Sequence, residues 1–198
     1  NYYKKKIKII HIPLEKNYTY NAKKIIEKKI KILHIATSEH NKNTFRMASA
    51  LKGIKNIHYR IIGVIPNKTL EFLNDNNIKW SIDYNISDSD LLKEYINSDL
   101  VVFPSLYEGF GMPIIEAQAL GRVVLTSSIE PMVDISGKAA ILVNPYKISE
   151  IRKGVLSFIN ENKSNQLLIE QGIINSKRFR LEKIVNQYYN LYLNAIGL

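Results

Sequence analysis

The chain of 198 residues contains no cysteine, which excludes disulfides, thiolate nucleophiles and cysteine-based zinc sites. It has no apolar run that approaches the roughly 18 residues of a membrane-spanning helix. Its first residues, Asn-Tyr-Tyr-Lys-Lys-Lys, lack the long apolar block of a secretory signal. These absences favour a cytoplasmic setting. Because the first residue is not Met, we also expect the sequence to be a fragment.

Acidic residues are scarce in the first part of the chain, which is therefore strongly basic. Residues 1–31 contain ten of the 28 basic residues but two of the 18 acidic ones, whereas the rest is nearly neutral. Such a stretch can bind anionic lipid, at about 1 kcal/mol per basic residue. It can equally be a solvated lysine-rich linker, and both interpretations stay open. No recognition helix, zinc finger or RNA-stacking motif is visible, so we expect no nucleic-acid partner.

Strand-like and helix-like segments alternate along the chain. We expect strands over residues 6–12, 31–36, 57–64, 78–82, 100–103, 123–126 and 140–143. We expect helices over residues 43–52, 68–74, 90–97 and 113–120, and from 148 to the end. Between the first two strands, residues 14–30 read as a polar connection with a lysine-rich helical pattern. The alternation predicts an α/β fold, a Rossmann-like doubly wound parallel sheet whose ligands bind beyond the carboxyl ends of its strands.

The most informative stretch is Pro-Ser-Leu-Tyr-Glu-Gly-Phe-Gly-Met-Pro-Ile-Ile-Glu-Ala, residues 104–117. It follows a buried-strand pattern and contains two closely spaced glycines, Gly109 and Gly111, which let a backbone approach a ligand closely. Pro113 then suits the first turn of a helix, where its missing N–H costs nothing. A strand, a glycine loop and a helix start form an anion site, because the first N–H groups of a helix are unpaired and its dipole end is positive.

Two carboxylates flank this loop, Glu108 before the glycines and Glu116 in the first turn of the expected helix. They would repel a phosphate, but they suit neutral hydroxyls, since hydrogen bonds to a charged acceptor are the stronger kind. A phosphate site with a hydroxyl-binding carboxylate on each side is typical of a nucleotide-sugar site. The alternative is an ordinary strand-to-helix turn with a glutamate near the helix start.

At these residues the sequence resembles the donor-binding domain of retaining glycosyltransferases with the GT-B fold, in particular glycosyltransferase family 4. The resemblance runs from about residue 32 to 192, with further matches at residues 98–105, 121–128 and 139–145. It implies the C-terminal half of a GT-B fold. It also implies that Glu116 holds the ribose diol and that Glu108 contacts the transferred sugar. The donor would further be bound around the motif residues Gly109, Phe110, Gly111, Met112 and Pro113, through backbone N–H groups at its centre.

The resemblance adds residues from two other loops. Lys42, after the strand over 31–36, would neutralise the diphosphate as a compact charge, although a solvated lysine at a helix start is the alternative. Relatives often carry an arginine five positions earlier, where this chain has Thr37. Thr37 then either contributes a hydroxyl, or the leaving group is stabilised less. Asn85 and Ile86 correspond to a loop beside the nucleotide base.

Asp88-Ser89-Asp90 resembles the DxD triplet that holds a metal in glycosyltransferases of another fold. Because Ser87 and Asp88 directly precede an expected helix, helix capping explains them better. We therefore expect no metal and no cofactor besides the nucleotide-sugar substrate. Residues 130–134 would form a short loop over the donor. His40 is expected at the surface, and packing or edge positions are expected for His11, His34 and His58.

The resemblance also divides the chain. Residues 1–22 would be the end of an acceptor domain and the hinge linker, residues 23–178 the donor domain, and residues 179–198 the helix that crosses back over the hinge. The N-terminal acceptor domain would then be missing. The tyrosines of the last helix either stay partly exposed without that domain or cover this domain's own core.

The implied function is transfer of a hexose from a UDP- or GDP-linked sugar to a saccharide or glycolipid in bacterial surface polysaccharide synthesis. The setting would be the cytoplasm, with peripheral contact at the inner face of the membrane. The implied mechanism is front-face displacement, with Lys42 and the helix start at Pro113 stabilising the departing phosphate. The isolated fragment would be inactive. The alternatives are a non-catalytic nucleotide-sugar-binding module, another GT-B enzyme such as an epimerase or phosphorylase, and a protein that binds anionic polymers.

Overall fold

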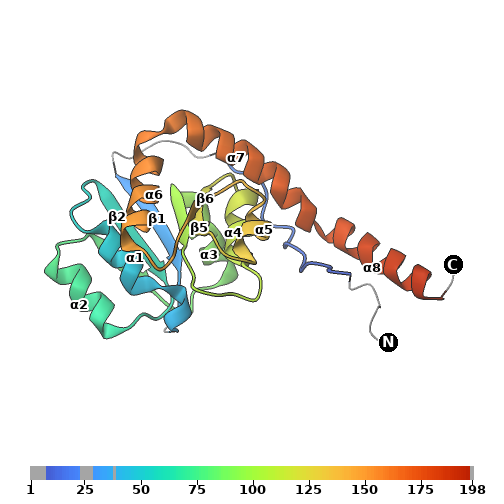
Figure 1. Cartoon of the computed structure of the whole chain (residues 1–198), viewed down its shortest axis with the longest axis horizontal. Coiled ribbons are helices and arrows are strands. Elements are labelled where there is room, and N and C mark those ends of the chain that lie inside the picture. Colours follow the sequence, from blue (N-terminus) through green and yellow to red (C-terminus); the bar gives the residue numbers. More distant parts are fainter. Residues whose placement is uncertain (1–7, 23–28, 38, 197–198) are drawn as a thin grey trace.

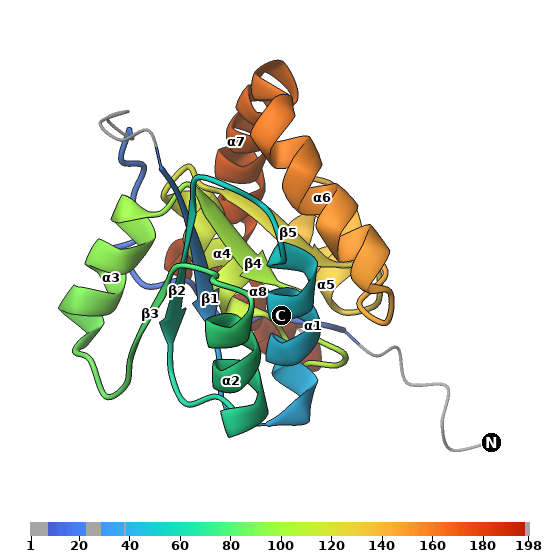
Figure 2. The ribbon, with the colours of Figure 1, turned by 90° about the vertical axis from the view of Figure 1, so that its left-hand side faces the viewer.

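The computed structural model describes residues 8–22, 29–37 and 39–196. They form a six-stranded, all-parallel sheet in the order β3-β2-β1-β4-β5-β6, with helices on both faces (Figures 1 and 2). The strands are β1 (Ile30–Ile35), β2 (Ile57–Ile62), β3 (Trp80–Asp83), β4 (Leu100–Phe103), β5 (Val123–Ser127) and β6 (Ile141–Val143). The expected Rossmann-like doubly wound sheet is confirmed. Its strand order reverses between the neighbouring strands β1 and β4, which makes that position the topological switch point.

The helices divide into two layers. The first core cluster joins one face of the sheet to α1 (Thr44–Leu51), α2 (Asn67–Asp75) and α6 (Ile148–Asn160). The second joins the other face to α3 (Asp88–Asn97), α4 (Met112–Ala119) and α5 (Met132–Ser136). The chain then forms α7 (Asn162–Ser176), which packs on α4, and α8 (Leu181–Ile196). Two short 3-10 turns are η1 (His40–Lys42) and η2 (Lys177–Phe179).

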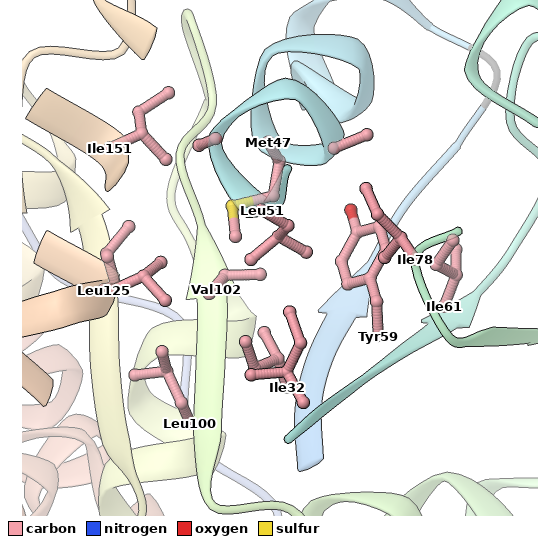
Figure 3. Packing of buried hydrophobic residues seen from close by; sticks show 14 of the residues in the cluster. Ile32, Met47, Leu51, Tyr59, Ile61, Ile78, Leu100, Val102, Leu125 and Ile151 are labelled. Atoms are coloured by element: carbon pink, nitrogen blue, oxygen red, sulfur yellow. The ribbon is translucent and has the colours of Figure 1, made fainter. Parts of the chain in front are cut away.

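The core explains why the strands read as continuous apolar runs. All four residues of β4 are buried, as expected for a parallel strand that is covered on both faces. Side chains alternate along each strand, so that Ile32 of β1 belongs to the α1 layer and Leu33 to the α4 layer. Figure 3 shows Met47 and Leu51 of α1 packed over Ile32 and Val102.

The expected strand over residues 6–12 is wrong for the part that the structure describes, because residues 8–12 have no strand pairing. Residues 8–22, here called the strap, instead pass beside the start of α8 (Figure 1). The Leu14 N–H donates to the carbonyl of Phe179 over 2.7 Å, and Leu14 makes one isolated bridge with Arg180. Residues 6–7 and most of the lysine-rich stretch, including residues 23–28, lie outside the described residues.

The C-terminal part of the chain contains one correction and settles one alternative. Residues 132–136 form the helix α5, so the expected loop over residues 130–134 is largely helical, and Asp134 lies 3.2 Å from Arg178 and 3.5 Å from His11. The helical pattern expected from residue 148 onward is confirmed by α6, α7 and α8, of which α8 is the separate last helix. In α8 only Ile184 is buried, whereas its tyrosines are exposed and do not cover this domain's own core: Tyr188, Tyr189 and Tyr192. Within the described ranges, no helix is both long and apolar enough to cross a membrane.

Candidate functional site

The site residues come together at the carboxyl ends of β1 and β4. These strands are hydrogen-bonded neighbours, with Leu33 beside Val101 and His34 beside Val102. After β1 the chain turns through η1 into α1, and after β4 it forms the loop of residues 104–111 that leads into α4. Loops from adjacent parallel strands emerge at the same edge, which is where ligands bind in open α/β sheets.

Lys42 and Glu108 meet across this edge. The Lys42 ammonium donates to Glu108 Oε1 over 2.7 Å, although 66 residues separate the two in sequence. Their side chains are only 16% and 13% exposed. The Lys42 Nζ also lies 4.9 Å from the centre of the Phe103 ring, where a cation is attracted to the aromatic face. Lys42 is therefore a largely buried, paired cation, and the alternative of a solvated lysine is wrong.

Asn43 fastens the surrounding loops. Its backbone is left-handed, with φ 59°, a conformation that asparagine tolerates better than most residues. Its side-chain Nδ2 donates to the carbonyls of Pro104, over 2.9 Å, and of Pro145, over 2.7 Å. A single amide thus joins the loops that follow β1, β4 and β6.

The glycine loop has the geometry that its sequence indicates. Gly111 has φ 120°, a conformation that residues with a Cβ rarely adopt, and it directly precedes α4. A Cβ at Gly111 would also lie 3.1 Å from Ile114 Cδ1. Pro113 lies in the first turn of α4, as expected. At Gly109, by contrast, a Cβ would meet no other residue within 4 Å.

Glu116 lies in the second turn of α4 rather than in the first turn as expected, and it has a different environment from Glu108. The Tyr95 hydroxyl, from α3, donates to Glu116 Oε2 over 2.6 Å. Burial raises the pKa of Glu116, the hydrogen bond from Tyr95 lowers it, and the charge of Glu15 raises it, with a net increase. Burial, together with the charge of Glu116, holds the pKa of Tyr95 well above its usual range, so this phenol stays protonated and donates.

Three expected donor contacts are not joined to this cluster. Thr37 is exposed and its hydroxyl accepts from the Glu39 N–H over 3.4 Å. Asn85 is exposed after β3, at the edge of the sheet, and Ile86 packs against the second core cluster. Among the described residues, no hydrogen bond or ion pair connects these three to the lysine or to either glutamate, and their roles stay predictions.

The capping interpretation of Asp88-Ser89-Asp90 is confirmed. Ser87 precedes α3, and its hydroxyl accepts from the Asp90 N–H over 3.2 Å. Asp90 also pairs with Lys93 over 2.8 Å. In the part of the chain that the structure describes, no group of three or more His, Cys, Asp or Glu could hold a metal ion.

The packing role expected for His34 is also confirmed. Its Nδ1 lies 2.6 Å from the Tyr59 hydroxyl beneath the site. Burial, with the nearby charge of Lys42, lowers the pKa of His34 to about 3, so the ring is neutral.

Sequence reasoning did not find three contacts that shape the site. These are the hydrogen bond from Tyr95 to Glu116, the two hydrogen bonds donated by the Asn43 side chain, and the packing of His11 on Phe110, with ring centres 5.7 Å apart. Each partner lies far away in sequence, so no local pattern marks the contact.

The comparisons with known proteins agree with this geometry. The family model described as "Glycosyl transferases group 1" matches residues 17–174. Over 107 residues the chain is 29% identical to the O-antigen chain mannosyltransferase B of Escherichia coli, a match that covers 54% of this chain and 28% of that relative. The chain spans about half the length of the curated relatives that it matches along most of its own length.

Two solved structures share the fold. Anabaena HepE, in complex with UDP and glucose, superposes with a TM-score of 0.82 at 15% identity, covering 93% of this chain and 56% of that one. The C-terminal domain of a group 1 glycosyl transferase, LpcC from Francisella tularensis, gives a TM-score of 0.70 at 20% identity and covers 85% of this chain and 99% of that one. The fold is therefore that of the C-terminal half of GT-B glycosyltransferases.

Proposed function

The chain belongs to the glycosyl transferases of group 1, and we propose that it is the nucleotide-sugar-binding half of a retaining enzyme, of the family 4 type. The reaction is transfer of a sugar from a nucleoside diphosphate to a saccharide or glycolipid acceptor. The observation that carries the proposal is the Lys42–Glu108 pair at the switch point, beside the glycine loop and the start of α4.

Each group has a distinct task in this proposal. Lys42 and the N–H groups at the start of α4 bind the diphosphate and stabilise the charge that develops on it as it leaves. Glu108 accepts hydroxyls of the transferred sugar, and Glu116 accepts the ribose diol. Because protein groups neutralise the diphosphate, we propose no metal or other cofactor. The open space at the Gly109 backbone gives the donor room to approach.

We propose a UDP- or GDP-linked hexose as the donor and bacterial surface polysaccharide as the pathway. The likeness to an O-antigen mannosyltransferase and to a protein bound to UDP and glucose supports both choices. The acceptor side belongs to a further domain, since relatives are about twice as long. The proposed location is the cytoplasmic face of the membrane, where the lysine-rich stretch contacts anionic lipid.

The second candidate is a binding module that holds the nucleotide sugar but transfers nothing unless another domain supplies the acceptor. The half-length match favours it. Transfer activity of the 198-residue chain by itself would exclude this candidate.

Calorimetric titration with UDP, GDP and ADP tests the donor site. We expect one of these nucleotides to bind, Glu116→Gln to remove that binding, and Glu170→Gln to keep it. Glu170 is a suitable control because it is an exposed glutamate on α7 whose side chain, among the described residues, accepts from Gln166 across one helical turn. Unchanged binding in Glu116→Gln would refute the assignment.

The stereochemical part of the proposal needs the full-length protein. NMR of the product's anomeric centre should show the same configuration as in the donor. An inverted product would overturn the retaining mechanism and leave the donor site standing.

A further inference from the structure

The two site glutamates are held by opposite kinds of partner. Glu108 pairs with a cation, Lys42, over 2.7 Å. Glu116 accepts instead from a neutral phenol, Tyr95, over 2.6 Å. An ammonium would compensate the negative charge of Glu116, whereas the phenol fixes one carboxylate oxygen and leaves that charge in place. The charge of Glu108 is therefore compensated by its partner, whereas the charge of Glu116 is not.

We propose that Tyr95 is a positioning residue for ribose recognition, which orients Glu116 by one oxygen so that the other faces the ribose diol. This inference rests on the proposed function. A carboxylate offers about four acceptor positions on its two oxygens, and the phenol uses one of them. Fixing the side chain in advance lowers the entropy lost when the nucleotide binds.

Tyr95 is itself anchored firmly enough for this role. Its ring is fully buried near the end of α3. Arg122 donates to the carbonyl of Tyr95 over 3.1 Å and to that of Ile96 over 2.9 Å, which ties down the last turn of the helix. Tyr18 of the strap meets the Tyr95 ring edge-on, with the ring centres 5.9 Å apart. Arg122 also holds the strap through the Asn21 carbonyl.

The charges around Glu116 make its ionisation sensitive to this one hydrogen bond. Tyr95 reaches it from α3, and Glu15 and Tyr18 reach it from the strap. On the other side of α4, the contact with α5 and α7 runs through the uncharged Gln118 and Asn175. Within the described part of the chain, none of these neighbours of Glu116 is a cation. Burial raises the pKa of Glu116 and the bond from Tyr95 lowers it, so removal of the phenol hydroxyl should raise that pKa further.

The test removes the hydroxyl alone, with Tyr95→Phe. The probes are UDP and GDP, each compared with its 2′,3′-dideoxy analogue, which lacks the diol. We expect up to about tenfold weaker binding of the ribonucleotide that binds the wild type, because the freed Glu116 side chain must then be immobilised when the diol binds. Binding of the dideoxy analogue should change less than twofold.

The matched control is Tyr59→Phe, which removes a buried tyrosine hydroxyl bonded to His34 in the other core layer. Because Tyr59 belongs to the first core cluster and Tyr95 to the second, the effect of Tyr59→Phe on the ribonucleotide and on the dideoxy analogue should be equal. An equal loss for both ligands in Tyr95→Phe as well would mean that Tyr95 only stabilises the fold, which overturns the inference.

A second readout does not depend on nucleotide binding. Titration of the Glu116 carboxyl, followed by carbon-13 NMR and assigned with Glu116→Gln, should show a higher pKa in Tyr95→Phe than in the wild type. An unchanged pKa would refute the coupling even if nucleotides bind. If Tyr95→Phe raises this pKa but the wild type binds neither UDP nor GDP, the coupling between Tyr95 and Glu116 is confirmed. The absence of nucleotide binding then overturns the proposed donor site.

Discussion

The Lys42–Glu108 pair makes a quantitative prediction about stability. Removal of one partner of a buried ion pair costs about 3–5 kcal/mol, because the other charge is left uncompensated. Both side chains retain a little exposure, so we expect the low end of that range, about 3 kcal/mol for Glu108→Gln and for Lys42→Met. The double variant leaves no orphan charge. It should therefore lose about 2 kcal/mol less than the sum of the two single losses.

Urea unfolding of the four proteins at pH 7 measures this coupling energy. If the single losses add in the double variant to within about 0.5 kcal/mol, the pair does not couple and the reasoning is refuted. The same variants separate the functional roles of the two residues. Glu108→Gln releases Lys42 from a competing carboxylate and should bind pyrophosphate more tightly than the wild type, whereas Lys42→Met should bind it more weakly.

Two further predictions concern the loop and the layer beneath it. Gly109→Ala should leave the free energy of unfolding within about 0.5 kcal/mol of the wild type, yet weaken nucleotide binding, because the added Cβ enters open space over the site. Gly111→Ala should instead lower the free energy of unfolding by about 1–3 kcal/mol, because the residue has a φ of 120°. Urea unfolding measures the stability of both variants and calorimetry measures their nucleotide binding. Equal losses of stability in the two variants would contradict the prediction. His34 has a folded pKa of about 3, below its unfolded value, so the unfolded chain binds more protons in acid. Stability should therefore fall as pH drops from about 6.5 toward 3, by up to about 1.4 kcal/mol per unit, and His34→Gln should flatten this profile in urea titrations at several pH values.

The elements around the motif could be predicted because their signals are local. A continuous apolar run marks β4, the glycines mark a loop after it, and Pro113 marks the first turn of α4. These features need no knowledge of the rest of the chain. The same is true of the capping serine, Ser87, before α3.

Other features depend on the complete fold. The start of the strap is rich in isoleucine, as strands often are, but β1 is already paired on both sides, with β2 and β4. The strap packs at Leu14 against Phe179 and Arg180 instead. The Tyr95–Glu116 bond joins two helices across a strand and a loop, so neither residue type nor spacing predicts it.

The side-chain amide of Asn43 affects how rigid the site is before a ligand binds. It connects the backbone after β4 to the backbone after β6 through one side chain that itself follows β1. Three segments that could each fluctuate separately are thus held in one arrangement before any ligand arrives. The conformational entropy of these three loops is therefore lost when the chain folds rather than when a ligand binds. We therefore expect these three loops to rearrange little when a ligand binds.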